Sequence, residues 1–168
     1  MKQTVLLFIV LGCILINPCG GRAQKVGADS VIYFSDMQLD SMLNGKASTE
    51  KALSFLLGRS QDKERYLVVL RTKPGDVEIH EQFDDVAIVR SGHAVLRTGS
   101  KVSGSKESGN PGTREWGGGV IEDGKERALS AGDFVVIPAM LAHQYIPNGR
   151  EAFTYWTIKV RRLKTSSR

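Results

Sequence analysis

The sequence predicts an all-β protein, built as an antiparallel sandwich or barrel, from three features. Short runs rich in Val, Ile and aromatic residues follow one another from residue 66 onward. Gly, Pro, Asp and Asn separate these runs at close intervals, as turns do in antiparallel sheets. No helical pattern long enough to connect parallel strands lies among them. The sequence therefore favours antiparallel strands over an alternating α/β fold.

The first 23 residues have the layout of an export signal. Lys2 precedes an apolar run over residues 5–16, and Gly21 and Ala23 supply small residues at the recognition positions. We expect cleavage after Ala23, an exported protein, periplasmic or secreted, and no stable membrane insertion afterwards. Two alternatives are an uncleaved anchor, for which the run is short, and a lipoprotein modified at Cys19.

Composition then limits what the mature chain can be. Both cysteines lie within residues 1–23, so disulfides cannot stabilise the remainder, and a single domain has to rely on its own core. Removing Lys2 and Arg22 lowers the net charge of +5 by two. Lys159 belongs to a basic cluster at the C-terminal end, whose last residues, 163–168, we interpret as a solvated tail rather than a contact for an anionic surface. Aromatic residues do not alternate with basic ones, so we expect no nucleic-acid partner.

Residues 24–65 are predicted to form an N-terminal helical segment with two short helices. The stretch "SDMQLDSMLNG" has Ser35 or Asp36 as its N-cap and Gly45 after its end. The stretch "STEKALSFLLG", residues 48–58, repeats this design and closes on Gly58.

The β domain is predicted to cover residues 66–162. Its candidate strands are 66–72, 77–80, 85–90, 93–98, 119–121, 127–129, 134–137, 143–146 and 152–160.

One interval, residues 99–119, does not fit a strand. It is dense in Gly, Ser and charged residues, and its apolar residues are Val102 and Trp116. We expect a long, mobile loop between two halves of the sheet. It is either a disordered insertion or a lid over a pocket, with Trp116 as its contact.

The stretch "IHEQFDDVAIVRSG", residues 79–92, crowds polar side chains ahead of an apolar run. His80 and Gln82 share a face if the strand is regular. If residues 83–84 form a tight turn, Asp85 begins the next strand and points inward again. His143 opens a later strand and returns to His80 if the sheet closes into a barrel. Two imidazoles and a carboxylate are the minimum set for a divalent transition metal with open coordination positions.

These residues resemble the first of the two motifs of the cupin superfamily. Gly75 leads to His80, and Gln82 stands where a second His is usual. Asp85 stands where Glu is usual, and Gly92 follows at the expected distance.

The second cupin motif is also matched with changes. Gly132 is followed by Pro138, and Met140 replaces the usual Gly. His143 falls at the metal-binding His, and Asn148 lies one residue later than the pattern. The resemblance covers residues 66–160 and implies an antiparallel cupin-type β-barrel, jelly-roll-like in its topology, and a homodimer.

The resemblance further implies a metal site made by His80, Gln82, Asp85 and His143, for Fe, Mn, Ni or Zn. Gln82 is either a fourth ligand or a donor to a ligand. We expect a metal-dependent enzyme acting on a small organic molecule, of the oxygenase, isomerase or lyase type. The alternative is a metal-free cupin that binds a small ligand without catalysis.

Other side chains near this site have two interpretations each. Arg71 and Arg90 either hold a substrate carboxylate or face solvent at strand ends. Tyr145, Tyr155 and Trp156 either line the barrel as a binding surface or fill it.

Overall fold

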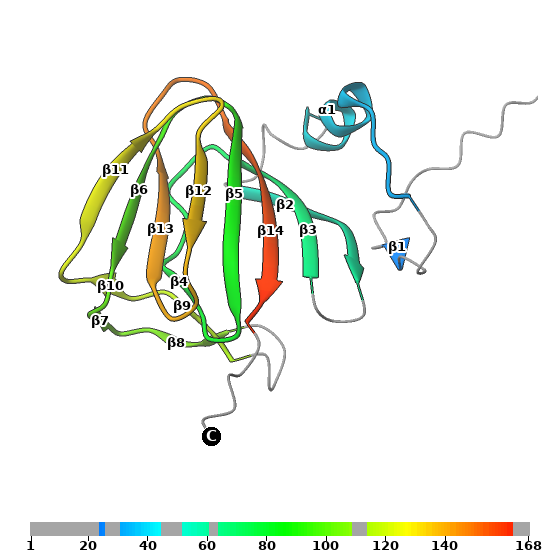
Figure 1. The fold of residues 1–168 in the computed structure, drawn as a ribbon. Helices are drawn as coiled ribbons and strands as arrows, with labels where there is room; N and C mark the ends of the chain where they lie inside the picture. Colours follow the sequence, from blue (N-terminus) through cyan, green and yellow to red (C-terminus); the bar gives the residue numbers. More distant parts are fainter. Residues whose placement is uncertain (1–23, 26–30, 45–51, 61–63, 109–113, 163–168) are drawn as a thin grey trace, which may run out of the picture.

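The chain is described by a computed structural model that covers residues 24–25, 31–44, 52–60, 64–108 and 114–162 (Figure 1). The predicted export signal and the predicted C-terminal tail lie outside the described residues. Within those ranges, no helix is both long and apolar enough to cross a membrane.

The described residues form one helix and a series of short strands. The helix is α1, Asp36–Asn44. The strands are β1 Gln24–Lys25, β2 Ala52–Ser60, β3 Glu64–Arg71, β4 Glu78–His80, β5 Phe83–Ser91, β6 Ala94–Gly99, β7 Val102–Ser103, β8 Lys106–Ser108, β9 Glu115–Gly117, β10 Val120–Ile121, β11 Lys125–Leu129, β12 Phe134–Ile137, β13 Ala142–Pro147 and β14 Phe153–Arg161.

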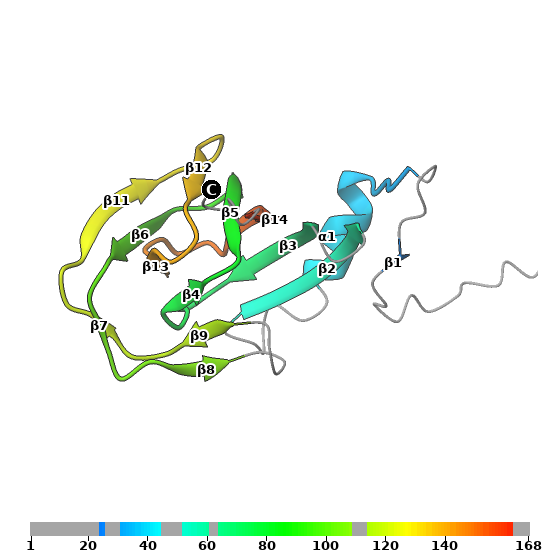
Figure 2. The ribbon, with the colours of Figure 1, turned by 60° about the horizontal axis from the view of Figure 1, so that its bottom comes forward.

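Most of the strands belong to two six-stranded sheets that face each other (Figure 2). The front sheet has the order β1-β2-β3-β14-β5-β12, and the back sheet has the order β11-β6-β13-β4-β9-β8. The pairings are antiparallel except for β1 with β2. The predicted closed barrel is wrong for the described residues, because the two sheets pack through side chains and no hydrogen-bonded ladder joins their edges.

The core between the sheets draws on both of them. Val69 and Ala87 from the front sheet pack with Leu96 and Tyr145 from the back sheet. The predicted strand ranges are confirmed, since each of them overlaps a strand of the structure. The reason is visible in β5, where buried and more exposed side chains alternate from Phe83 to Val89.

The first predicted helix is confirmed, and its N-terminus is a capping box. The Gln38 amide donates to the Ser35 hydroxyl at 3.3 Å, and the Ser35 amide donates to the Gln38 side chain at 2.8 Å. Leu39 and Leu43 are buried against the outer side of the front sheet, where Val68 lies. Figure 2 shows α1 covering β2 and β3 from that side.

The second predicted helix is wrong for the residues that the structure describes, because residues 52–58 of the predicted range 48–58 belong to the strand β2. This strand pairs antiparallel with β3 from Ala52 to Ser60. Leu57 is buried in the same cluster as the α1 leucines. A local preference for helix is weak compared with the backbone hydrogen bonds and burial that the edge of β3 offers. Residues 24–65 therefore add strands to the front sheet as well as a helix.

The prediction that residues 99–119 contain no strand is also wrong. Three short strands, β7, β8 and β9, lie within this interval. The strand β9 pairs with β4, opposite Ile79, and β8 pairs with β9. The Trp116 indole donates to the Glu81 carboxylate at 3.0 Å. The edge of β4 supplies backbone hydrogen-bond partners to β9, which the composition of residues 99–119 does not reveal. The action of residues 99–119 as a lid stays a prediction.

Candidate functional site

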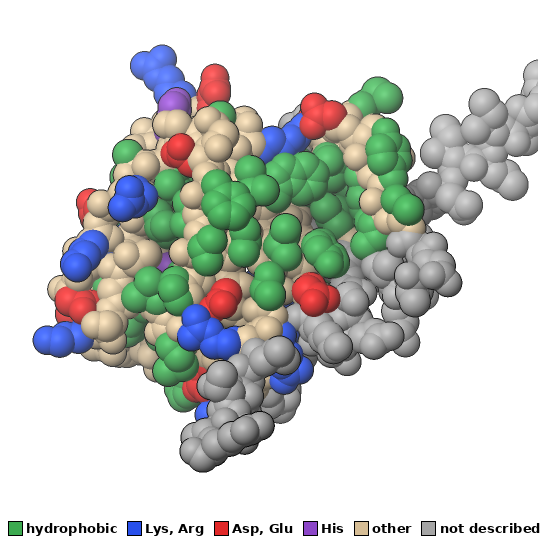
Figure 3. All heavy atoms as spheres, viewed as in Figure 1, with side chains coloured by type: hydrophobic (Ala, Val, Ile, Leu, Met, Phe, Trp, Pro, Cys, Tyr) green, Lys and Arg blue, Asp and Glu red, His purple; other side chains and the backbone are tan. Residues whose placement is uncertain are grey.

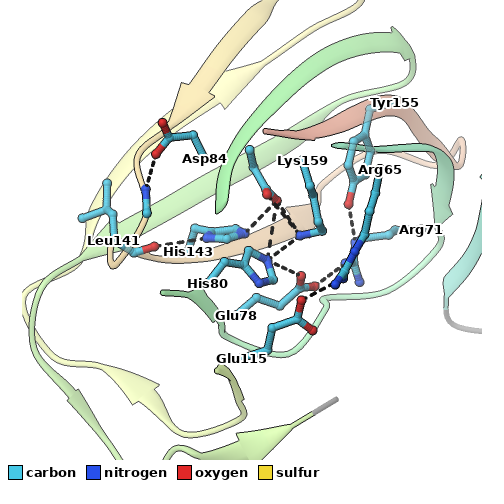
Figure 4. A network of polar contacts seen from close by, with 12 residues as sticks. Arg65, Arg71, Glu78, His80, Asp84, Glu115, Leu141, His143, Tyr155 and Lys159 are labelled. Carbon is cyan, nitrogen blue, oxygen red and sulfur yellow. Dashed lines mark hydrogen bonds and ion pairs between the residues drawn. The ribbon is translucent and has the colours of Figure 1, made fainter. Parts of the chain in front are cut away.

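Three of the four predicted site residues meet between the two sheets. His80 comes from β4, His143 from β13 and Asp85 from β5, and all three are buried. Figure 4 shows the two histidines side by side. The two imidazole rings have centroids 5.4 Å apart. The Asp85 Oδ2 atom lies 3.6 Å from the Nε2 atom of His80 and 3.7 Å from that of His143.

Gln82, the fourth predicted ligand, lies elsewhere. Its Oε1 atom accepts a hydrogen bond of 2.5 Å from the exposed Arg161 guanidinium. Glu81 and Gln82 form the bend between β4 and β5, so the regular alternation that would place Gln82 beside His80 is interrupted there. The structure thus separates Gln82 from the other three residues.

The predicted turn at residues 83–84 is wrong, because β5 begins at Phe83. Asp85 still points inward, since it shares a face with Phe83. Asp84 is on the opposite face, where it accepts a hydrogen bond of 2.6 Å from the Ala139 amide and pairs with Arg162 at 2.9 Å.

Glu78 is a site residue that the sequence reasoning missed. It lies two positions before His80 on the same face of β4, and its Oε2 atom is 3.5 Å from His80 Nε2. Burial alone would raise the pKa of Glu78, but the contact with His80 and the charges of His143, Arg71 and Lys159 outweigh it and lower that pKa well below its ordinary value. Glu78 is therefore a carboxylate at neutral pH. Strand alternation counted backwards from His80 would have found it.

Lys159 is the second missed residue. The sequence groups it with the basic C-terminal cluster, yet its side chain is buried. Its Nζ atom lies 2.6 Å from His80 Nε2 and 3.0 and 3.1 Å from the two Asp85 oxygens. It is positioned by β14, which pairs with β5 so that Lys159 stands opposite Asp85.

His143 presents a free lone pair to this group. Its Nδ1 atom is 3.2 Å from the Leu141 carbonyl oxygen, which only accepts, so Nδ1 donates and Nε2 carries the lone pair. Nε2 is buried and has no hydrogen-bond partner among the described residues. Burial is the main cause that lowers the pKa of His143, against the opposing charges of Glu78 and Asp85. A carbonyl that orients the far nitrogen is typical of metal-binding histidines.

The donor atoms fit a divalent transition metal. We call their residues the cage: Glu78, His80, Asp85 and His143. Glu78, His80 and His143 each offer a ligand atom, and these atoms lie within 4.8 Å of one another. Metal–ligand distances of about 2.1 Å in a tetrahedral site place neighbouring donors about 3.4 Å apart. The separations of 3.5 Å between Glu78 and His80, 3.6 Å between His80 and Asp85, and 3.7 Å between His143 and Asp85 are close to that spacing.

Comparison with solved structures identifies the fold. The chain matches the cupin domain of Cnp3 from Schizosaccharomyces pombe with a TM-score of 0.50 and 8% identity, over 68% of this chain and 67% of that one. The described part of the chain therefore has a cupin fold. The fold that the resemblance of the two sequence motifs implies is thereby confirmed.

Other solved structures match the chain with lower TM-scores. One is an oxalate decarboxylase from Lactobacillus farciminis in a formate complex, with 13% identity, a TM-score of 0.47 and coverage of 68% of this chain and 30% of that chain. Another is a cupin superfamily protein from Desulfitobacterium hafniense, with 17% identity, a TM-score of 0.44 and coverage of 66% and 78%. The chain thus spans less than a third of the length of the decarboxylase. No family model and no curated protein matches its sequence.

Beyond the cage, the interior between the two sheets is aromatic. Tyr145 and Tyr155 stack with their ring centroids 4.6 Å apart, which places both of them inside the sandwich. The Arg71 guanidinium links the two regions, because it donates to the Tyr155 hydroxyl at 3.0 Å and pairs with Glu78 at 2.7 Å. The Tyr145 hydroxyl is buried without a partner in the described part of the chain.

Two other candidates from the sequence have structural contacts outside the interior. Arg90 pairs with Asp36 and, at 2.7 Å, with Asp40, so it ties α1 to β5. Trp156 packs against the cluster beneath α1.

A separate pocket of about 330 Å³ lies on the other side of β4. Ile79 lines it and alternates with His80, so the pocket and the cage occupy opposite faces of the strand. Trp116 also lines this pocket, so the residue named as the contact between residues 99–119 and a pocket does lie beside one. The remaining lining residues are Glu81, Ser100, Val102, Ser105, Met140 and Ala142.

Proposed function

We propose that this cupin binds a divalent transition metal, Fe, Mn, Ni or Zn, through the cage and acts on a small organic molecule. The observation that carries this proposal is the buried His143 Nε2 atom, whose lone pair faces the Asp85 carboxylate and has no partner among the described residues. A buried imidazole nitrogen held in this tautomer is costly unless a ligand or ion uses it. Gln82 is not part of the proposed ligand set, because its side chain binds Arg161.

Residues around the cage would orient a ligand of the metal and anchor a substrate. Leu141 orients His143 through its carbonyl oxygen. The Tyr145 hydroxyl and the Arg71 guanidinium lie on the inner side of β13 and β3 and offer polar anchors for a substrate with hydroxyl or carboxylate groups. A bound metal would supply a Lewis acid or an oxygen-activating centre, which suits an oxygenase, isomerase or lyase reaction.

Metal analysis of protein purified without added metal tests this proposal. We expect stoichiometric metal in the wild-type protein and in a His93→Ala control, because His93 is exposed and contacts Ser130 instead of the cage. The double variant His80→Ala, His143→Ala should lose the metal while keeping its circular dichroism spectrum. Wild-type protein that neither contains nor takes up any of the four metals would contradict the proposal.

The second candidate function, a metal-free cupin that binds a small ligand, is favoured by a different observation. Lys159 and Arg71 already balance the negative charges of Glu78 and Asp85. A thermal-shift screen of small organic acids and alcohols, with and without metal, separates the two candidates. A ligand that stabilises the metal-free protein, and still does so in the His80→Ala, His143→Ala variant, supports the second.

We also propose that the chain forms a homodimer through the exposed side of the front sheet. In the described residues β12 is an edge strand of that sheet, and Phe134 and Val136 on it are 63% and 54% exposed. Figure 3 shows hydrophobic side chains gathered over β12, β5 and β14. Edge strands and apolar patches of this kind need a cover. Light scattering should give a dimer for the wild type and a monomer for the variant Phe134→Glu, Val136→Glu, and a monomeric wild type would contradict the proposal.

Export remains a proposal that rests on residues 1–23 of the sequence alone. Mass spectrometry of the protein recovered from its native host should show a chain that begins at Gln24. A chain that still carries Met1 or a lipid on Cys19 would contradict cleavage after Ala23.

A further inference from the structure

We propose that the Lys159 ammonium is a built-in cation of the cage, which a metal ion must displace in order to bind. The inference rests on the proposed function, because it concerns how the same site admits a metal. It assigns to Lys159 control over metal affinity, a role that neither the cupin motifs nor the basic C-terminal cluster indicates.

Lys159 and a metal require the same lone pair. An ammonium group has three donors and no acceptor, so His80 Nε2, at 2.6 Å from Nζ, must accept from it. A metal bound by His80 through Nε2 would use the same pair of electrons. The two cations therefore exclude each other at this atom.

The Asp85 carboxylate is engaged in the same way. Lys159 Nζ lies 3.0 and 3.1 Å from its two oxygens, so both oxygens accept from the ammonium. One of them, Oδ2, is the atom that faces the free His143 nitrogen at 3.7 Å. The lysine thus holds one imidazole and one carboxylate of the cage, and it leaves His143 as the only cage histidine whose Nε2 has no partner.

The formal charges around the cage sum to zero without a metal. Glu78 and Asp85 contribute two negative charges, and Lys159 and Arg71 contribute two positive ones. A divalent ion added to this arrangement would leave two excess positive charges in a buried site, which is costly at low dielectric. Moving the lysine outward removes one of them, so binding and displacement are coupled.

The backbone stays in place while this happens. In the strand ladders, the backbone of Lys159 stands opposite Arg65 of β3 on one side and opposite Asp85 of β5 on the other. The backbone position of Lys159 is therefore fixed inside the front sheet. The exchange has to occur by rotation of the side chain, which has a long, flexible stem. Its side chain is 11% exposed, which provides a route to solvent.

Titration of metal-free protein with Co²⁺ and Zn²⁺ tests the inference. In Lys159→Met, which keeps most of the unbranched stem and removes the charge, we expect the dissociation constant to fall by about tenfold or more, because one positive charge near the ion is gone. The control Lys125→Met removes an exposed lysine on β11 and should bind as the wild type does. The absorption of bound Co²⁺ reports whether nitrogen and oxygen ligands surround it in each variant.

The outcomes separate the two proposals. If wild type and Lys159→Met bind with equal affinity, the inference about Lys159 is overturned and the metal site stands. If neither of them binds Co²⁺ or Zn²⁺, the proposed metal function fails and the inference fails with it.

A measurement on the wild type covers the case in which Lys159→Met does not fold. Peptide mapping after brief amine acetylation should show little reaction at Lys159 without metal and a several-fold increase when Zn²⁺ saturates the site. Lys125 should react equally in both states. Acetylation of Lys159 that is unchanged or reduced by bound Zn²⁺ overturns the displacement.

Discussion

The two ends of the interior between the sheets are built from the same strands but have opposite chemistry. On β13, His143 belongs to the cage and Tyr145, two residues later, belongs to the aromatic core. On β14 the order is reversed, with Tyr155 in the core and Lys159 at the cage. The aromatic end is stabilised by apolar packing, whereas the buried charges of the polar end are stabilised by ion pairs with one another. The comparison shows that the apolar core and the proposed metal site occupy neighbouring positions on the same strand face.

Breaking the aromatic end should have the largest effect. Phe153 is fully buried and packs with Tyr145 and Tyr155. We expect Phe153→Ala to lower the free energy of unfolding by about 3–5 kcal/mol in urea denaturation, because it leaves a cavity. The matched change Phe134→Ala, on an exposed strand face, should cost about 1 kcal/mol or less. Equal losses in the two variants would show that the aromatic end is not the main core.

Breaking the polar end should cost nearly as much. Asp85→Ala removes the carboxylate opposite Lys159 and leaves its buried ammonium with only the His80 nitrogen. We expect a loss of about 3 kcal/mol in the same assay, since an uncompensated buried charge is strongly destabilising. The exposed Asp76→Ala is the control and should stay within about 0.5 kcal/mol of the wild type. If Asp85→Ala were as stable as the wild type, the charge pair would not lie in a buried site.

Tyr145 and Tyr155 lie between the aromatic end and the polar end, so variants of the two residues show where one end passes into the other. Tyr155→Phe removes a hydroxyl that accepts from Arg71, so we expect a loss of about 1.5–3 kcal/mol. Tyr145→Phe removes a hydroxyl without a partner among the described residues and should be neutral or slightly stabilising. Chemical denaturation of both variants measures the difference. A larger loss of stability for Tyr145→Phe than for Tyr155→Phe would show that the Tyr145 hydroxyl, and not the Tyr155 hydroxyl, belongs to the polar end.

The smallest expected effect is a change in the pH dependence of stability. The pKa of His143 is lowered in the folded protein from its ordinary value of 6.5, so the unfolded chain binds a proton there first as pH falls. Its contribution is fully present above pH 6.5 and is lost as pH falls below that value. Glu78, whose pKa is also lowered, loses its contribution only below its ordinary value of 4.5.

Denaturation of metal-free protein between pH 7 and about 5.5 therefore isolates His143 from Glu78. We expect the stability of His143→Gln to fall less steeply over this interval than that of the wild type. His93→Gln, at an exposed position, should keep the wild-type slope. A slope that depends on His93 and not on His143 would contradict the burial of the cage histidine.

Much of the strand pattern could be predicted because short runs rich in Val, Ile and aromatic residues are bounded by turn residues. The runs around Val86 and Val135 are of this kind, and both form strands at the predicted places. The helix from Asp36 was predictable for a similar reason, since its cap and its buried leucines lie within one short segment. The second predicted helix failed because Leu57 is buried by β3 and α1, partners that a local pattern does not contain.

The candidate site was predictable only in part. His80, Asp85 and His143 were found because their residue types and spacing match known motifs. Gln82 was placed with them on the assumption of an unbroken strand, and a bend at residues 81–82 separates it. Glu78 and Lys159 carry no motif, so their residue types alone did not mark them.

The sequence by itself determined that the chain makes short antiparallel strands, that α1 begins near Ser35, and that two histidines and an aspartate are available for one site. These features are local, because strand alternation and helix capping depend on neighbours a few residues away. Only the tertiary structure decided that Lys159 enters the cage. Its position follows from the register of β14 against β5, and a lysine is stable between two sheets only where a carboxylate from another strand meets it.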